Sequence, residues 1–135
     1  MNARKRFKLI VYSLLLVIAL GLIIWYWLYS SAQGRDYERL ADLRLAQSRL
    51  IDYYLKYNTF KVPYCPTPIT LNDCQGKNNE NTGLENIVDP LNDGTYYYNL
   101  VYLGDDDFQI NFTLEVGING LPAGIYKITK AGVSQ

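Results

Sequence analysis

The apolar and polar positions of this chain form a long uninterrupted apolar run, then a stretch with helical period, then stretches with strand period. The apolar run covers residues 9–29, where only Ser13 and Gly21 fall outside the hydrophobic set. As a helix it would be about 31 Å long, close to the hydrocarbon thickness of a bilayer. Aromatic side chains typical of membrane interfaces gather at its end, at Trp25, Tyr26, Trp27 and Tyr29. The run predicts one transmembrane helix.

A helical period follows in residues 35–57. Long side chains recur there at alternating spacings of three and four, at Leu40, Leu43, Gln47, Leu50, Tyr54 and Tyr57. The pattern predicts an amphipathic helix that packs through Leu40, Leu43, Leu50 and Tyr54. Charged pairs such as Asp36 with Arg39 are expected on its flanks. Because no proline separates the two helical segments and Gly34 is only a weak break, we expect one continuous or gently bent rod.

The remaining sequence predicts a loop followed by an antiparallel meander. Pro63, Pro66 and Pro68 end the helical region, and residues 58–94 are rich in turn formers. Within residues 95–130, aromatic and β-branched side chains predict strands at 95–103, 108–116 and 125–129. The second strand alternates strictly, with one face made of Phe108, Ile110, Phe112, Leu114 and Val116. A helix across a three-stranded sheet buries both apolar surfaces, so we expect an α+β fold.

The distribution of charge predicts how the chain crosses the membrane. The 13 basic and 13 acidic residues cancel, but four cations precede the apolar run, which leaves 13 − 4 = 9 basic against 13 acidic residues after it. These cations are Arg4, Lys5, Arg6 and Lys8. By the positive-inside rule, residues 1–8 form a cytoplasmic tip and residues 30–135 an extracytoplasmic head. The four cations and Trp25, Trp27 and Tyr29 are expected at the membrane interfaces, and no nucleic-acid partner is expected.

A cleaved signal peptide is the alternative to a retained anchor. Ser30, Ser31 and Ala32 supply the small residues that a signal peptidase prefers. The apolar run is nevertheless longer than the roughly 7 to 15 residues usual for a signal peptide, and it ends in bulky aromatic side chains. The retained anchor is therefore the favoured interpretation.

The two cysteines predict a disulfide outside the cytoplasm. Cys65 and Cys74 lie in a segment rich in proline, threonine and asparagine, where a covalent bridge would hold a loop without regular structure. Two buried free thiols are the alternative.

The chain has no histidine, which excludes histidine-based catalytic triads and histidine metal ligands.

The acidic residues are candidate metal ligands and candidate catalysts. Asp105, Asp106 and Asp107, with Asn92 and Asp93 nearby in the sequence, carry the oxygen atoms that Ca²⁺ prefers. A solvated turn after Gly104 is the alternative explanation of the three aspartates. Other acids, such as Asp89 and Glu115, show no spacing that singles out a catalytic pair, so they are expected to be solvated. We expect no enzymatic activity and no cofactor, with calcium as the open alternative.

A group of tyrosines offers an aromatic surface. In an extended strand, Tyr97 faces away from Tyr96, Tyr98 and Tyr102. One face is expected to pack against the helix, and the other is a candidate surface for a sugar or a protein partner.

The order of these segments resembles a type IV pilin or a type II secretion pseudopilin, and most closely the major pseudopilins. The resemblance covers residues 7 to about 130. It is carried by Arg35, Asp36, Arg39, Ala41, Asp42, Leu43, Arg44, Gln47, Leu50, Tyr53 and Tyr54 in the helix, by Asn58, Thr59, Phe60 and Pro63 after it, by Asp89, Pro90, Leu91, Asn92, Tyr96 and Tyr98 before the sheet, and by residues 108–115 in it. The family has a long N-terminal helix packed on an antiparallel meander, and calcium often binds in the loops of its sheet.

The prepilin peptidase site of that family is absent from this chain. In the family a glycine precedes Phe-Thr-Leu-x-Glu, whereas here Arg6 precedes Phe7 and Val11 occupies the position of the glutamate. In the family this glutamate is thought to pair with the freed amino terminus of a neighbouring subunit. Because glycine and glutamate are lost together, we expect an unprocessed leader or a minor subunit.

The sequence therefore predicts a structural subunit of a type IV pilus or type II secretion-like assembly. We expect it to reside in the inner membrane with its N-terminus inside, and to contact like or other pilin-like subunits through the N-terminal helix. The alternatives are an anchored extracytoplasmic binding module on a pilin-like fold and a secreted enzyme released after Ala32.

Overall fold

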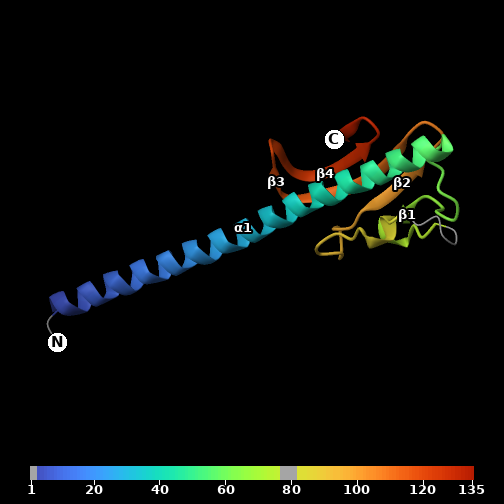
Figure 1. The fold of residues 1–135 in the computed structure, drawn as a ribbon. Coiled ribbons are helices and arrows are strands. Elements are labelled where there is room, and N and C mark those ends of the chain that lie inside the picture. The colour runs from blue at the N-terminus through green and yellow to red at the C-terminus, as the bar shows by residue number, and fades with distance from the viewer. Residues whose placement is uncertain (1–2, 77–81) are drawn as a thin grey trace.

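The computed structural model describes residues 3–76 and 82–135, without the side chains of Ala3 and Lys5. Its elements in chain order are α1 (Ala3–Tyr57), β1 (Ile69–Thr70), the 3-10 turns η1 (Leu71–Asp73) and η2 (Leu84–Asn86), β2 (Asn99–Leu103), β3 (Phe108–Ile118), β4 (Leu121–Thr129) and β5 (Gly132–Ser134). The fold is α+β: one long N-terminal helix packs on an antiparallel sheet (Figure 1).

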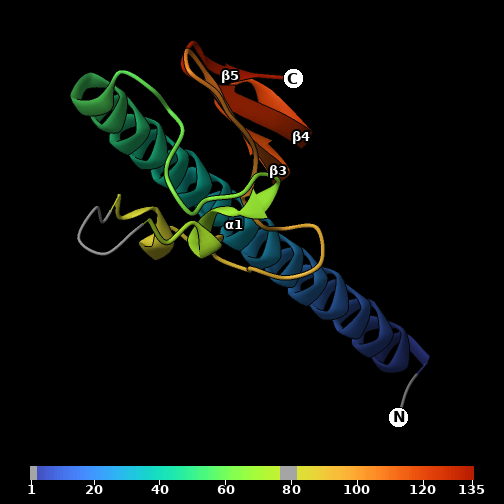
Figure 2. The ribbon, with the colours of Figure 1, turned by 90° about the vertical axis from the view of Figure 1, so that its right-hand side faces the viewer.

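The helix α1 is continuous from end to end. All 55 of its residues are helical, Gly34 included, so the two helical segments read from the sequence are one rod of about 83 Å. Its first half extends alone, and the rest of the chain folds around its second half (Figures 1 and 2). The first buried side chain is that of Ala32.

The sheet has five strands in the order β1-β2-β3-β4-β5, all antiparallel, so the prediction of three strands is wrong. The two additional strands, β1 and β5, lie at the edges and have two and three residues. Segments this short carry no readable alternation, and only their pairing defines them as strands. The predicted first strand begins late, at Asn99, because a tight turn closed by a hydrogen bond from Tyr96 N–H to the Asp93 carbonyl (2.7 Å) precedes it.

The predicted alternation of β3 holds as far as Leu114 and then fails. Phe108, Ile110, Phe112 and Leu114 are buried, but Val116 is not, because the register shifts between Leu114 and Gly117. A second shift, between Leu100 and Tyr102 in β2, leaves Tyr102 exposed while Tyr98 is buried. Each bulge adds a residue and turns the following side chains to the other face.

One face of α1 and one face of the sheet enclose the core (Figure 2). Leu40, Leu43, Ala46 and Leu50 are buried along the helix, and Tyr54 stacks at half-exposure on Phe60 with ring centroids 4.7 Å apart. Gln47, the polar member of this stripe, donates from Nε2 to the Thr129 carbonyl at 2.8 Å. The loop between α1 and β2 completes the core with Val62, Leu71, Leu84 and Ile87. The predicted disulfide between Cys65 and Cys74 is present in this loop.

Candidate functional site

A buried ionic cluster joins the helix to the sheet and the loop. We call it the Arg39 cluster; its members are Arg35, Asp36, Arg39, Asp89 and Glu115. The Arg39 guanidinium is fully buried. It donates two hydrogen bonds to Asp89, at 2.7 and 3.0 Å, and one each from Nη1 to Asp36 at 2.8 Å and to Glu115 at 2.6 Å. One side chain thus contacts acids from α1, the loop and β3.

Asp36 holds the bulge of β3 in place. Its carboxylate accepts hydrogen bonds from the backbone N–H groups of Glu115 (2.9 Å), Val116 (3.0 Å) and Gly117 (2.9 Å). The register shift frees these N–H groups from the ladder, and a buried carboxylate is the acceptor that satisfies them. The side chain that neutralises Arg39 therefore also fixes the backbone of the strand opposite.

Asp89 fixes the loop that precedes β2. Besides its two bonds from Arg39, its Oδ1 accepts from the backbone N–H of Leu91 at 2.9 Å, in the manner of an Asx turn. The Tyr96 ring lies over the same guanidinium, with 4.8 Å from Cζ to the ring centroid. A cation on an aromatic face is further stabilised when water is excluded.

Glu115 and Arg35 form the rim of the cluster. Arg35 donates to both carboxylate oxygens of Glu115, at 2.7 and 2.6 Å, and its side chain is 31 % exposed. Hydrogen bonds from Arg35, together with those from Arg39, lower the pKa of the Glu115 carboxyl against the opposing effect of its partial burial. Two cations and three carboxylates leave the cluster with a formal charge of −1.

Burial disfavours the charged form of the Arg39 guanidinium, but its hydrogen bonds to three carboxylates outweigh this effect. Desolvation alone would lower the pKa of the guanidinium, but hydrogen bonds to Asp89, Glu115 and Asp36 raise it. The charge is therefore permanent, and it is stable only while the three acids surround it.

Asp42 and Tyr98 continue the polar contacts one turn further along α1. The Tyr98 hydroxyl donates to Asp42 at 3.1 Å. Burial raises the pKa of the Asp42 carboxyl, and the hydrogen bond from Tyr98 opposes that rise. Burial and the neighbouring Asp42 charge raise the pKa of Tyr98.

The expectation of solvated acids is wrong for Asp89 and for Glu115. Asp89 is buried, and the Glu115 side chain is 12 % exposed. The pair of Asp36 and Arg39 also lies in the core and not on a solvated flank. Helical spacing places Asp36 beside Arg39, but no local signal shows that both turn inward, because that depends on Asp89 and Glu115, which are 50 and 76 residues from Arg39.

The N-terminal half of α1 is the second part of the site. It is the one helix, among the described residues, that is long and apolar enough to cross a membrane, with a window of mean hydropathy 2.6 that is wholly unburied. Its large apolar side chains between Phe7 and Tyr29 are each 37 to 69 % exposed. Trp25 stacks on Tyr29 with ring centroids 5.9 Å apart, and Trp27 is also exposed. Arg4, Arg6 and Lys8 are exposed at the other end, and the Lys5 side chain lies outside the described part.

Two of the three aspartates of the calcium hypothesis, Asp105 and Asp107, bind separate partners through their side chains. Asp105 accepts from Lys61 Nζ at 2.7 Å, and this bond lowers its pKa. Asp107 accepts from the backbone N–H groups of Phe108 and Lys130, each at 2.9 Å. Asn92 and Asp93 lie before the opposite end of β2. In residues 3–76 and 82–135, no three acidic or cysteine side chains gather in a way that would hold a metal ion.

The site thus combines the uncovered apolar half of α1 with the Arg39 cluster. The first residue of the cluster, Arg35, lies six residues after Tyr29, or about 9 Å along the helix. Comparison of the chain with protein-family models, with curated proteins and with solved structures gives no match. The function is therefore inferred from the geometry of the chain itself.

Proposed function

We propose that the chain is a membrane-anchored structural subunit that assembles through the first half of α1 and displays its head outside the cytoplasm, as pilins and pseudopilins do. The observation that carries this proposal is the uncovered apolar rod at residues 9–29, continuous with the helix that forms the core of the head. Apolar surface of this extent is not stable in water, so lipid or other helices must cover it.

The Arg39 cluster supports a mechanical role for the helix. Three carboxylates from separate segments bind one buried guanidinium next to the end of the apolar run. Separating Asp89 from Arg39 would leave a buried carboxylate without its cation. The cluster therefore resists rotation of the head against the rod. A displacement of the rod, for example on packing against a neighbouring rod, is thereby transmitted to the head.

The proposal includes an unprocessed leader. Arg6 and Val11 replace the glycine and glutamate that the resemblance would require for cleavage and for pairing with a freed amine. A rod without the glutamate carries no acid inside residues 9–29, so no buried charge needs a partner there. Packing of such rods depends on apolar contacts and on small residues such as Gly21.

The test is the mass of the chain extracted from membranes, followed by crosslinking. We expect a chain that starts at Met1. A start at Phe7 would contradict the unprocessed leader, and a start at Gln33 would overturn the anchor itself.

For crosslinking, a photoreactive residue in place of Leu16 or Ile23 should give adducts of twice the mass of the chain. The matched control is the same residue in place of Tyr102, an exposed aromatic position of the head. Adducts at the control position alone, or at none of the three, would contradict assembly through the rod.

A further inference from the structure

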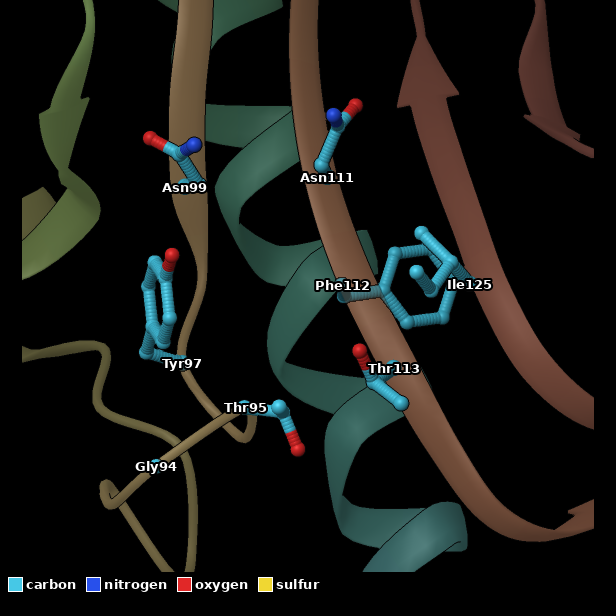
Figure 3. A pocket seen from close by; sticks show the side chains of 8 residues that line it. All are labelled: Gly94, Thr95, Tyr97, Asn99, Asn111, Phe112, Thr113 and Ile125. Atoms are coloured by element: carbon cyan, nitrogen blue, oxygen red, sulfur yellow. The ribbon is translucent and has the colours of Figure 1, made fainter.

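The face of the sheet turned away from α1 carries a hollow of about 260 Å³. Figure 3 shows the side chains of Tyr97, Asn99, Asn111 and Thr113 on this face, with α1 behind the sheet. Thr95 and the exposed Ile125 close its edges. In β3 the buried core residues alternate with Asn111 and Thr113. The polar side chains of this strand therefore lie on the outer face.

The lining of the hollow combines the apolar surface of Tyr97, Phe112 and Ile125 with neutral hydrogen-bonding side chains, those of Thr95, Asn99, Asn111 and Thr113. Among residues 3–76 and 82–135, no charged side chain lines it. The side chains of Asn99 and Thr113 make no hydrogen bond to any described residue, whereas Asn111 accepts one from Gln109 at 2.8 Å and keeps its own NH₂ group for another partner. Amide and hydroxyl groups at half-exposed positions therefore remain available to a ligand.

Tyr97 stands between this hollow and a second one. The second hollow, of about 250 Å³, shares Gly94 and Tyr97 with the first and adds Thr70, Asn92 and Asp93. A ligand that lies across the tyrosine ring can thus reach polar groups on both sides.

We propose that this paired hollow binds a neutral oligosaccharide. The C–H face of a sugar ring packs on the Tyr97 ring, while its hydroxyl groups bond to Asn99, Asn111 and Thr113. An anionic ligand finds no cation among the described residues that line either hollow, and the one acid among them, Asp93, belongs to the second hollow. An apolar ligand would leave the amides without partners. A peptide strand is disfavoured, because the backbone of β2 and β3 is already paired with neighbouring strands on both edges.

The experiment uses the full chain in a detergent without a sugar headgroup. Neutral tetrasaccharides of glucose and of N-acetylglucosamine are titrated by calorimetry, with a tetrasaccharide of galacturonic acid as the charged comparison. We expect saturable binding of at least one neutral probe. Tyr97→Ala should weaken it about tenfold, and Tyr102→Ala, an exposed tyrosine outside the hollow, less than about twofold.

Thr113→Val is the second variant, because it removes one hydroxyl and keeps the shape of a strand residue. It should weaken binding about fivefold without changing the melting temperature. Absence of saturable binding by every neutral probe would overturn the proposal. Binding that survives Tyr97→Ala and Thr113→Val unchanged, or that favours the charged tetrasaccharide, would overturn it as well.

Discussion

At the scale of single residues, Arg39 determines how the helix, the loop and the sheet meet. Its guanidinium is planar and presents donors in fixed directions, so it can bind Asp89 with two bonds and still reach Asp36 and Glu115. A lysine ammonium is a single charged point and cannot reproduce that arrangement. The identity of the side chain matters here as much as its charge.

Removing the Arg39 charge should destabilise the head strongly. In Arg39→Met three carboxylates lose their common partner, and we expect a loss of about 3–5 kcal/mol in the free energy of unfolding. Arg39→Lys should lose less than this. The measurement is chemical unfolding of the full chain, followed by the near-ultraviolet circular dichroism of its tyrosines.

Arg35→Met is the matched control, because Arg35 belongs to the same cluster but is partly exposed. It should cost about 1 kcal/mol. Equal losses for Arg35→Met and Arg39→Met would contradict the central position that we assign to Arg39.

Glu115 should make the stability of the head depend on pH in the acid range. Its pKa is lowered in the folded chain from an ordinary value of 4.5, chiefly by Arg35. As the pH falls through 4.5, the unfolded chain binds the proton first, so stability decreases until the folded carboxyl also becomes protonated. The stabilisation by the Glu115 charge is therefore complete above pH 4.5 and is lost below the pKa of Glu115 in the folded chain.

Unfolding measured from about pH 6 to about pH 3 checks this expectation. The stability difference between the wild type and Glu115→Gln should shrink as the pH falls. The raised pKa of Asp42 acts in the opposite direction but is common to both proteins. A difference that stays constant or grows would show that Arg35 does not stabilise the charged form of Glu115.

At the scale of elements, the continuity of α1 couples the rod to the head. Gly34 is the weakest helix former at the junction, yet the helix passes through it without interruption. A Cβ placed on Gly34 would meet no atom within 4 Å. Nothing in the fold therefore requires glycine at this position.

Gly34→Ala should raise the free energy of unfolding by about 0.5–1 kcal/mol, because alanine loses less backbone entropy in a helix. Gly120→Ala is the control: its Cβ also meets open space, but its φ of +82° is unfavourable for alanine, so this variant should be destabilised. Thermal unfolding of the full chain measures both. A Gly34→Ala variant less stable than the wild type would indicate that the helix bends at Gly34.

At the scale of the whole molecule, the uneven distribution of charge is expected to set the orientation. Four cations precede the apolar rod, and the remaining chain is acidic. A phosphatase that is active only outside the cytoplasm, fused after Gln135, should therefore be active.

Replacing Arg4, Lys5, Arg6 and Lys8 with glutamine should reduce the activity of that fusion, because the positive-inside signal is lost. The control is Arg44→Gln with Lys127→Gln, two basic positions of the head without an ion pair or side-chain hydrogen bond to the described residues, and it should leave the activity unchanged. High activity in both variants would contradict orientation by the N-terminal cations.

Residues close in sequence determined much of this structure. The apolar run, the three- and four-residue spacing after it and the alternation from Phe108 to Leu114 each predict an element that the fold contains. These signals are local, because the period of side-chain burial follows from the geometry of a single helix or strand. The disulfide was predictable for a similar reason, since two cysteines in one loop have few other partners.

Only the tertiary structure decided what depends on distant segments. The edge strands β1 and β5 exist through pairing alone, and the bulge after Leu114 exists because Asp36 accepts the N–H groups that it frees. Arg39 and Asp89 are buried together because neither charge could be buried alone. The sequence determines which elements form, because the period of each element is local. The free energy of burying a charge depends on all the segments around it, so only the tertiary structure determines which charges are buried.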